Sequence, residues 1–412
     1  MGIQLAREIT VYVAPEVARG TFVFPTGAQA IRVVGAPTFN QKPSYTDSAE
    51  VVNSRSRADR FLDANPPGDF SISHYARIGA TKTDVPEHDV LYKAALGGNG
   101  ATGANYTTYG LSVVKPSLSI LVAQADMVFG LRGCAIDTLK TSLSNKGAIK
   151  FDHSGKFMQM MFAGKTTYAA GMTYTNGTKK IVLPTSPGND YKKYTAGMRV
   201  KLWDADSGGT GAYLTDGTNA YFLISAVTAE DKSITLTAAI SGGTWTCATG
   251  DRVDPWYPTA SLPTTTILEM RNSKVYKGTA GTSAISVTAC DLTLADNIKF
   301  FDAEITDSGF PADFAEGDRK IDASISLYLR TDDIKYFRDG TDKVTSALYI
   351  EGIVSSIAPV RTNGMQLALP KALCSVPDIS GDQERTLKID HAALYSSAVE
   401  DEMVLKFGDL TA

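Results

Sequence analysis

The sequence has few of the residues on which most catalytic and metal sites depend. It contains 4 histidines and 4 cysteines in 412 residues, and no two cysteines form a CxxC pair. This spacing excludes a zinc knuckle or a redox dithiol, and we expect the cysteines to be small buried hydrophobic residues. The chain also lacks any run of about 18 apolar residues, and its first residues lack the apolar core of a signal peptide. We therefore expect a soluble chain, made in the cytosol, without membrane insertion.

Excess positive charge is absent as well. The chain has 40 Lys and Arg residues against 44 Asp and Glu, which gives a formal net charge of −4. Tight nucleic-acid binding needs a cationic excess to neutralise phosphates, so a protein that grips DNA is disfavoured. What the sequence does contain is 36 glycines and many short apolar alternations between turn residues. That composition is typical of a mainly β protein.

One strand pattern occurs twice. "SISHYAR" at Ser71–Arg77 returns as "SISLYLR" at Ser324–Arg330, 253 residues later. The match extends back through "AEVVNS" and "AEITDS" to "AIRV" at Ala30 and "AISV" at Ala284, with a single one-residue gap. An internal duplication of this length predicts two similar domains in one chain.

Both copies continue with the same order of elements. "DVLYKAALGG" at Asp89–Gly98 predicts a short helix with Asp89 as its N-cap and Gly97 as its stop, and "DIKYFRDG" at Asp333–Gly340 predicts a shorter one. Two hairpin patterns follow, with turns at "NKG" and "NG". An alternative alignment matches "IKFDH" with "LKIDH" instead. We prefer the alignment on the turns because it keeps each hairpin intact.

The chain therefore divides into three parts, at 1–165, 166–264 and 265–412. Each outer part predicts an antiparallel β-sandwich with one short α-helix. The middle part has short alternating strands and is flanked by Pro-rich linkers. We expect it to be a small β-barrel or β-sandwich inserted between the copies.

Sequence patterns that resemble cofactor, calcium or catalytic sites lack the context or the residues that such sites need. "GGNGATG" spells GxGxxG, but a helical stretch precedes it and β-forming residues follow, which is the wrong context for a dinucleotide site. "DADSGG" lacks the later acidic ligands of a calcium loop. His74 corresponds to Leu327 in the second copy, so a packing or surface role is favoured. Asp152, His153 and Ser154 are strand neighbours that point to alternate faces and cannot form a triad. We expect no catalytic residue, cofactor or metal site.

Two long loops, Asn40–Asp69 and Asp296–Asp318, are kept in both copies. Loops usually diverge, so we predict that these two mediate contacts between stacked rings of assembled subunits. The Arg-rich "SRSRADR" has no counterpart in "SGFPADF", which favours a solvated loop or a salt bridge to a neighbouring subunit over shared phosphate binding. The residues expected to make these contacts are Ser54, Arg55, Arg57, Arg60, Phe61, Asp307, Phe310 and Phe314.

The order of these patterns resembles the tail tube (major tail) proteins of bacteriophages with long non-contractile tails, of the type with a duplicated tube domain. In the first copy the resemblance rests on the early "AIRVV" strand, the Ser- and Arg-rich loop, "SISHYAR", the helix ending in "ALGG" and the "RGC" strand with its hairpin. In the second copy it rests on "TSALYIEGIV", "LALPKA" and "LKIDHAAL". It covers about residues 15–165 and 280–412 and leaves the middle part unassigned.

The resemblance implies a structural virion protein of the tail, assembled in the host cytoplasm, with no enzymatic activity. Two tube domains per chain imply homotrimeric rings of six similar domains, stacked into a hollow tube through which double-stranded DNA passes without specific binding. Besides other copies of itself, the implied partners are a tape measure protein, a tail terminator and distal tail or baseplate proteins. The inserted domain would lie on the outer surface, and deletion of Thr173–Thr264 would still allow tube assembly.

A second interpretation belongs to a different class of protein. A tandem β-sandwich adhesin or carbohydrate-binding surface protein would expose aromatic residues to its ligand, and all three tryptophans, Trp203, Trp245 and Trp256, lie in the middle part. A hydrolase is the least supported interpretation, since the sequence offers no set of nucleophile, base or metal ligands.

Overall fold

The protein is mainly β, as predicted: 48% of the residues lie in strands and 8% are helical. The computed structural model describes residues 8–50, 59–62, 65–97, 100–103, 105–112, 114–144, 146–183, 190–206, 211–242, 245–282, 284–302, 304, 309–353, 361, 363–382, 384–397 and 401–411. Within these ranges no helix has the length and apolar character needed to cross a membrane.

The chain forms two compact units. The first contains Met1–Ala30, Ser119–Gly133 and Phe157–Ser261, and the second contains Ile31–Leu118, Cys134–Lys156 and Leu262–Ala412. Strand β11 (Met127–Ser144) passes from the first unit into the second after Gly133. The division predicted from the repeat falls at residues 165 and 264, whereas the two compact units have different boundaries. The three-part division therefore stays a prediction.

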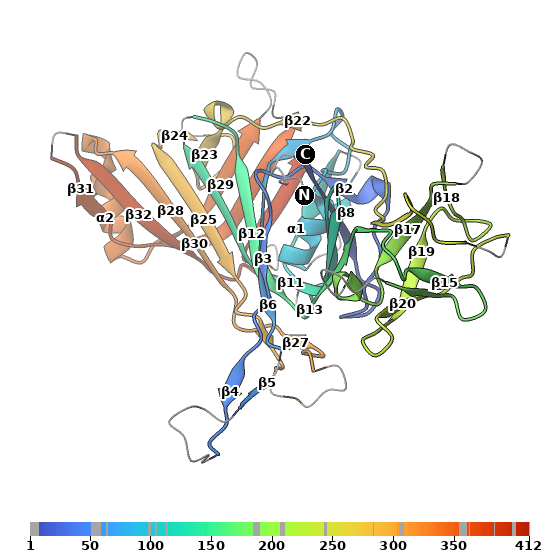
Figure 1. Cartoon of the computed structure of the whole chain (residues 1–412). Coiled ribbons are helices and arrows are strands. Elements are labelled where there is room, and N and C mark those ends of the chain that lie inside the picture. Colours follow the sequence, from blue (N-terminus) through green and yellow to red (C-terminus); the bar gives the residue numbers. More distant parts are fainter. Residues whose placement is uncertain are drawn as a thin grey trace. The chain divides into compact units, whose positions relative to one another are not determined.

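The second unit contains eight paired strands drawn from both copies of the repeat. In Figure 1 they run from β31 at the left to β3 and β6 near the centre. In order of pairing they are β3 (Thr38–Asn40), β6 (Gly68–Tyr75), β12 (Lys150–Phe157), β11, β25 (Ala289–Ala295), β28 (Lys320–Tyr328), β32 (Thr386–Ala393) and β31 (Asp378–Ser380). We refer to this arrangement as the long sheet.

The repeated strand has equivalent neighbours in the two copies. In β3 and β6, Thr38 lies opposite Ser71, and in β25 and β28 Asp291 lies opposite Ser324. Strand pairing therefore places Thr38 and Asp291 at equivalent positions, one residue away from the sequence match of Ala30 with Ala284.

On the other side of the repeated strand, β6 pairs with β12 and β28 pairs with β32. Because β12 carries "KFDH" and β32 carries "KIDH", the order of the strands agrees with the alignment that we did not prefer from sequence. The register differs from that alignment by two residues, since the Ala76 N–H donates to the carbonyl of Ile149 and the Leu329 N–H to that of Arg385. Both predicted hairpins nevertheless form, as β11–β12 and β29–β30.

A second series of paired strands lies in the same unit: β8 (Ala101–Thr102), β9 (Tyr106–Tyr109), β33 (Val404–Gly408), β30 (Gly364–Cys374), β29 (Thr345–Ile353), β23 (Lys274–Lys277) and β24 (Ala284–Ile285). The end of β30 also pairs with β32, which connects the two series. Helix α1 (Asp89–Leu96) packs between them, because the Tyr92 ring contacts Phe151 of β12 on one side and Phe407 of β33 on the other.

The two α-helices among the described residues correspond to the two predicted ones, with corrected ends. The N-cap of α1 is His88, and Asp89 is the first helical residue, where its carboxylate accepts a hydrogen bond from Lys93. Gly97 ends the helix with φ 83°, a conformation that favours glycine. Helix α2 (Lys335–Thr341) follows a 3₁₀ turn at Thr331–Ile334, so regular helix begins two residues later than predicted.

The first unit holds a sheet of eight strands, in the order β14 (Thr166–Thr167), β21 (Arg252–Pro255), β17 (Arg199–Asp204), β19 (Phe222–Thr228), β20 (Ser233–Leu236), β16 (Lys180–Val182) and β15 (Thr173–Thr175), with β18 (Ala212–Tyr213) beside β17. It also contains β1 (Ile9–Pro15), β10 (Leu118–Gln124) and β13 (Gln159–Gly164), with β2 (Ala30–Ile31) at its boundary. One apolar cluster joins Tyr12, Leu121 and Met161 with Val200, Phe222 and Ile234. The middle part therefore shares its core with strands from outside residues 166–264.

Candidate assembly surfaces

One face of the long sheet is polar in both copies. On β6, Ile72 and His74 are buried while Ser71 and Ser73 alternate with them on the other face. On β28, Ile325 and Leu327 are buried and the serines at 324 and 326 take the outer positions. Since successive strand residues point to opposite faces, the duplication preserves which face is buried.

Three strands of this polar face carry the pattern Lys-x-Asp, and in each case the lysine is paired with the aspartate two residues later. The ammonium-to-carboxylate distances are 2.8 Å for Lys150–Asp152, 2.9 Å for Lys320–Asp322 and 3.3 Å for Lys388–Asp390. The hydrogen bond and the charge of Asp322 raise the pKa of Lys320. Lys150, Lys320 and Lys388 are thus each neutralised by an aspartate of the same strand, whereas β12 also carries Lys156 on this face.

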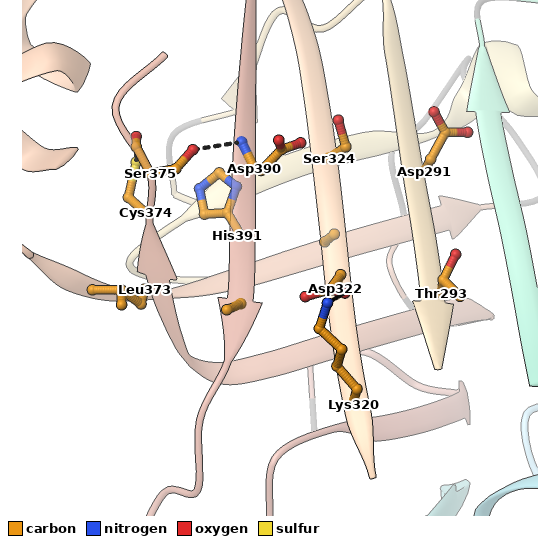
Figure 2. Close-up of a pocket in the computed structure, with 12 residues that line it drawn as sticks. Asp291, Thr293, Lys320, Asp322, Ser324, Leu373, Cys374, Ser375, Asp390 and His391 are labelled. Carbon is orange, nitrogen blue, oxygen red and sulfur yellow. Dashed lines mark hydrogen bonds and ion pairs between the residues drawn. The ribbon is translucent and has the colours of Figure 1, made fainter. Parts of the chain in front are cut away.

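A shallow pocket of about 510 Å³ lies on this face in the second copy (Figure 2). Strands β25, β28 and β32 contribute Asp291, Asp322 and Asp390, and Lys320 lies at the same surface. The Asp390 N–H donates to the Ser375 hydroxyl at 3.1 Å. In the part of the chain that the structure describes, no group of three His, Cys, Asp or Glu side chains is arranged to hold a metal ion. The pocket presents carboxylates and hydroxyls to solvent, and its lining also includes Cys374 and His391, which lie opposite each other on β30 and β32.

The two copies are joined inside the chain by strand pairing. β11 of the first copy pairs antiparallel with β25 of the second, from Thr138 opposite Ala295 to Ser144 opposite Ala289. At the outer ends of the long sheet, among the described residues, β3 pairs with β6 and with no second strand, and β31 pairs with β32 and with no second strand. All three residues of β31 are exposed. An edge strand of this kind offers unpaired backbone groups to another chain.

The first predicted contact loop contains an exposed hairpin. β4 (Tyr45–Asp47) pairs with β5 (Arg60–Leu62), and in Figure 1 this hairpin extends beyond the ends of β3 and β6. Tyr45 and Phe61 are each 52% exposed. Arg60 forms an ion pair with Asp47 at 2.8 Å and lies over the Tyr45 ring. Of the predicted contact residues in this loop, Ser54, Arg55 and Arg57 lie outside the described residues.

The second predicted contact loop is held by an internal aromatic pair. β26 (Lys299–Phe300) pairs with β27 (Phe314–Ala315), and the Phe300 and Phe314 rings lie 5.2 Å apart with both residues buried. Phe314 therefore fixes the loop from within instead of presenting its ring to solvent. Phe310 is half-buried, and Asp307 lies outside the described residues. The two loops meet where the Asn65 N–H donates to the Gly309 carbonyl at 3.3 Å.

A β-bulge in the long sheet anchors the base of the second loop. The register of β11 shifts between Ile136 and Thr138, which leaves Asp137 as the bulged residue. Its carboxylate accepts a hydrogen bond from the Ile298 N–H at 2.6 Å, and its carbonyl accepts one from the Asp296 N–H at 2.9 Å. The first copy therefore positions a loop of the second.

A buried ion cluster completes this anchor, and no sequence pattern indicated it. Asp296 accepts from Lys115 and from Arg319, and the Lys115 ammonium also donates to the carbonyl of Ala95 in α1. The Lys115 and Asp296 side chains are only 2% and 3% exposed. Burial lowers the pKa of Lys115, and the charge of Asp296 opposes that shift. The cluster ties the second loop to the helix of the first copy.

Three histidines of the first copy are buried together. The rings of His74 and His88 stack at 3.7 Å, and Nε2 of His74 lies 2.9 Å from Nε2 of His153. His74 Nδ1 faces the Tyr75 carbonyl, which can only accept, so Nδ1 carries the proton and Nε2 accepts from His153. Burial lowers the pKa of His88 to about 4 and that of His153 to about 3, and it lowers the pKa of His74 well below its usual value. This is a neutral packing cluster, and of the packing or surface role predicted for His74 it corresponds to the packing role.

Comparison with models of known protein families gives no match to the chain, and comparison with curated proteins gives none either.

Proposed function

We propose that this chain is a structural tube subunit, similar to the tail tube proteins of long non-contractile phage tails. Its two copies are tandem tube domains of the antiparallel sandwich type, and three chains close a ring of six similar domains. Stacked rings form a hollow tube in a virion tail, assembled in the host cytoplasm. The tape measure, terminator and distal tail proteins named above are its partners in this proposal, and double-stranded DNA passes through without specific binding.

The observation that carries this proposal is the internal joint between β11 and β25. One chain already contains one copy-to-copy contact of the kind that a ring repeats. The equivalents of β11 and β25 at the outer ends of the long sheet are β31 and β3, whose outer edges have no registered strand among the described residues. A head-to-tail contact between these edges repeats the same joint between chains, and a closed ring leaves no edge unpaired.

The register of the internal joint also gives a register for the proposed joint. Ser142 lies opposite Asp291 across β11 and β25. Asp291 corresponds to Thr38, because each lies opposite the repeated serine, Ser324 or Ser71. Ser142 lies opposite Lys150, and Ser380 lies opposite Thr386. Lys150 and Thr386 hold equivalent places, because the residue before each accepts a hydrogen bond from the same position of the repeated strand, Ala76 or Leu329. Thr38 of one chain should therefore face Ser380 of the next.

The polar face of the long sheet suits the inner surface of such a tube. Lys150, Lys320 and Lys388 are paired with aspartates of the same strands. The serines of β6 and β28 lie on the same face. A wall with uncompensated cations would hold DNA through its phosphates. A charge-compensated hydroxyl-rich wall lets DNA slide. The two contact loops leave the same end of the sheet, where they would meet the next ring.

Disulfide trapping tests the proposed joint. A variant with Thr38→Cys and Ser380→Cys, assembled and then oxidised, should give covalent dimers and trimers on a non-reducing gel, with the series ending at trimer. Each single substitution is the control for disulfides that involve the four native cysteines, and a Thr38→Cys, Lys388→Cys variant controls for a cysteine placed off the edge. A monomer that never cross-links, or a series that continues beyond trimer, would refute the ring of three chains.

A further inference from the structure

The sheet of the first unit carries a cationic aromatic face that the tube proposal does not use. On β17, Val200 and Leu202 are buried, while Arg199, Lys201 and Trp203 alternate with them on the opposite face and are half-buried. Neighbouring segments add further side chains to this face. We call the following set the β17 strip: Phe24, Arg199, Lys201, Trp203, Tyr213, Tyr221, Arg252 and Trp256.

Arg199 occupies one end of the β17 strip inside an aromatic cage. Its guanidinium carbon lies 4.2 Å from the ring centre of Phe24, 4.4 Å from that of Tyr221 and 5.4 Å from that of Trp256. A hydrogen bond from the Trp256 N–H to the Arg199 carbonyl, at 3.0 Å, fixes the two residues side by side. Among the described residues no carboxylate pairs with Arg199, and its Nε has no hydrogen-bond partner. The cage holds a guanidinium whose charge is not neutralised.

The other end of the β17 strip repeats the combination of cation and ring. The Lys201 ammonium lies 4.4 Å from the centre of the Tyr213 ring, and the Arg252 guanidinium lies 4.5 Å from that of Trp203. Trp203 and Arg252 are opposite each other on β17 and β21, so strand register creates this pair. Within the described part of the chain, Arg252 alone among these cations has a carboxylate partner, Asp254 at 2.8 Å. The strip thus has three cations and one paired carboxylate within a chain whose net charge is −4.

We propose that the β17 strip binds a carboxylated polysaccharide. Uncompensated arginine and lysine side chains recognise carboxylates through charge-assisted hydrogen bonds, and the flanking aromatic residues pack against the apolar edges of sugar rings. A neutral glycan fits less well. It would stack its sugar rings on the faces of the aromatic side chains, and arginine and lysine side chains already cover those faces. Single-stranded nucleic acid also combines charge with stacking, but it needs open rings and more cations than this strip offers. This site belongs to the first unit and does not rest on the tube proposal.

The test compares two ligands with the same sugar backbone, one with charged carboxylates and one with neutral methyl esters in their place. Oligogalacturonate and its methyl-esterified form have the same sugar backbone, and binding of each to the full-length protein can be measured by isothermal titration calorimetry at low salt. We expect binding of the acid form and none of the ester. Arg199→Met, which keeps the stem of the side chain in the cage, should weaken binding about tenfold, as expected for loss of one charge-assisted contact. Lys201→Met should weaken it as well.

The matched control is Lys192→Met in the same unit. Lys192 is an exposed lysine beside the ring of Tyr191, at 6.0 Å, outside the β17 strip. This control should bind oligogalacturonate as the unmodified chain does, and thermal unfolding should show that all variants are folded. Equal binding of acid and ester, equal loss in the control, or tighter binding of a single-stranded oligonucleotide than of oligogalacturonate would each overturn the proposal.

Discussion

The two copies of the repeated strand bury side chains at the same positions, but the buried side chains differ in polarity. β6 places His74 in the interior of the first copy, where it stacks with two other histidines, whereas β28 places Leu327 at the corresponding position. The second copy has one buried histidine, His391. The outer faces, by contrast, agree in their serines, and each copy carries at least one Lys-x-Asp pair. The duplication has thus preserved the polar face and the order of the strands more closely than the core, which suggests that the face and its edges carry the shared role.

The largest effect should come from the buried ion cluster that ties the copies together. Asp296→Asn removes the carboxylate that compensates Lys115 and Arg319, and breaking a buried pair in this way costs about 3 to 5 kcal/mol. Denaturant unfolding should show a correspondingly lower free energy of unfolding. Asp322→Asn, which removes an exposed aspartate from β28, is the matched control and should leave the unfolding midpoint unchanged. Equal effects of the two substitutions would mean that the cluster does not lock the copies.

The next effect is the pH dependence of the first copy. Burial holds the folded-state pKa values of His88 and His153 at about 4 and about 3, below the unfolded value of 6.5. The unfolded chain therefore binds more protons as the pH falls. Stability that is fully present above pH 6.5 is lost towards pH 4 and below, and at pH 5 each such histidine accounts for a loss of about 2 kcal/mol.

His74→Leu gives the first copy the residue that the second copy has at the corresponding position, Leu327, and so tests how much the histidine contributes to the acid sensitivity of the first copy. It removes one buried titrating group, so the fall in unfolding free energy between pH 7 and pH 5 should shrink by about 2 kcal/mol. At pH 7 the same variant should be less stable by about 1 to 3 kcal/mol, since the His153 N–H loses its acceptor. Denaturant curves at the two pH values give both quantities. An unchanged difference between pH 7 and pH 5 would show that the cluster does not govern acid sensitivity.

The smallest effect is expected where the copies agree. Lys150→Gln in β12 and Lys388→Gln in β32 each remove one half of an exposed pair on the polar face, and such pairs contribute little to stability. Thermal unfolding of the two variants should match that of the unmodified chain. A large loss in one variant alone would show that the two faces are not equivalent after all.

Much of the second unit could be predicted from sequence because its signals are local. The period of two in "SISHYAR" and "SISLYLR" predicts which side chains are buried, and Gly97 marks the end of α1. The ends of the helices were less certain: a cap depends on backbone geometry, and His88 takes the place that Asp89 was expected to fill.

The parts that sequence did not reveal are contacts between segments far apart in the chain. Lys115 and Asp296 are 181 residues apart, and neither lies in a pattern that marks a buried charge. Apolar alternation likewise indicates a strand's buried face but not its neighbour, so the pairing of β11 with β25 and the core shared by Tyr12 and Phe222 were not predictable. The same limit explains why the turns led us to favour one alignment while the order of the strands agrees with the other.

The most direct test of the account is electron cryo-microscopy of the assembled protein. We predict rings in which three chains supply six similar domains, with β3 of each chain beside β31 of the next and the Lys-x-Asp face towards the central channel. A ring of six chains, a ring that joins through other strands, or a protein that stays monomeric under all assembly conditions would contradict the claim that the internal joint between β11 and β25 is the model for assembly.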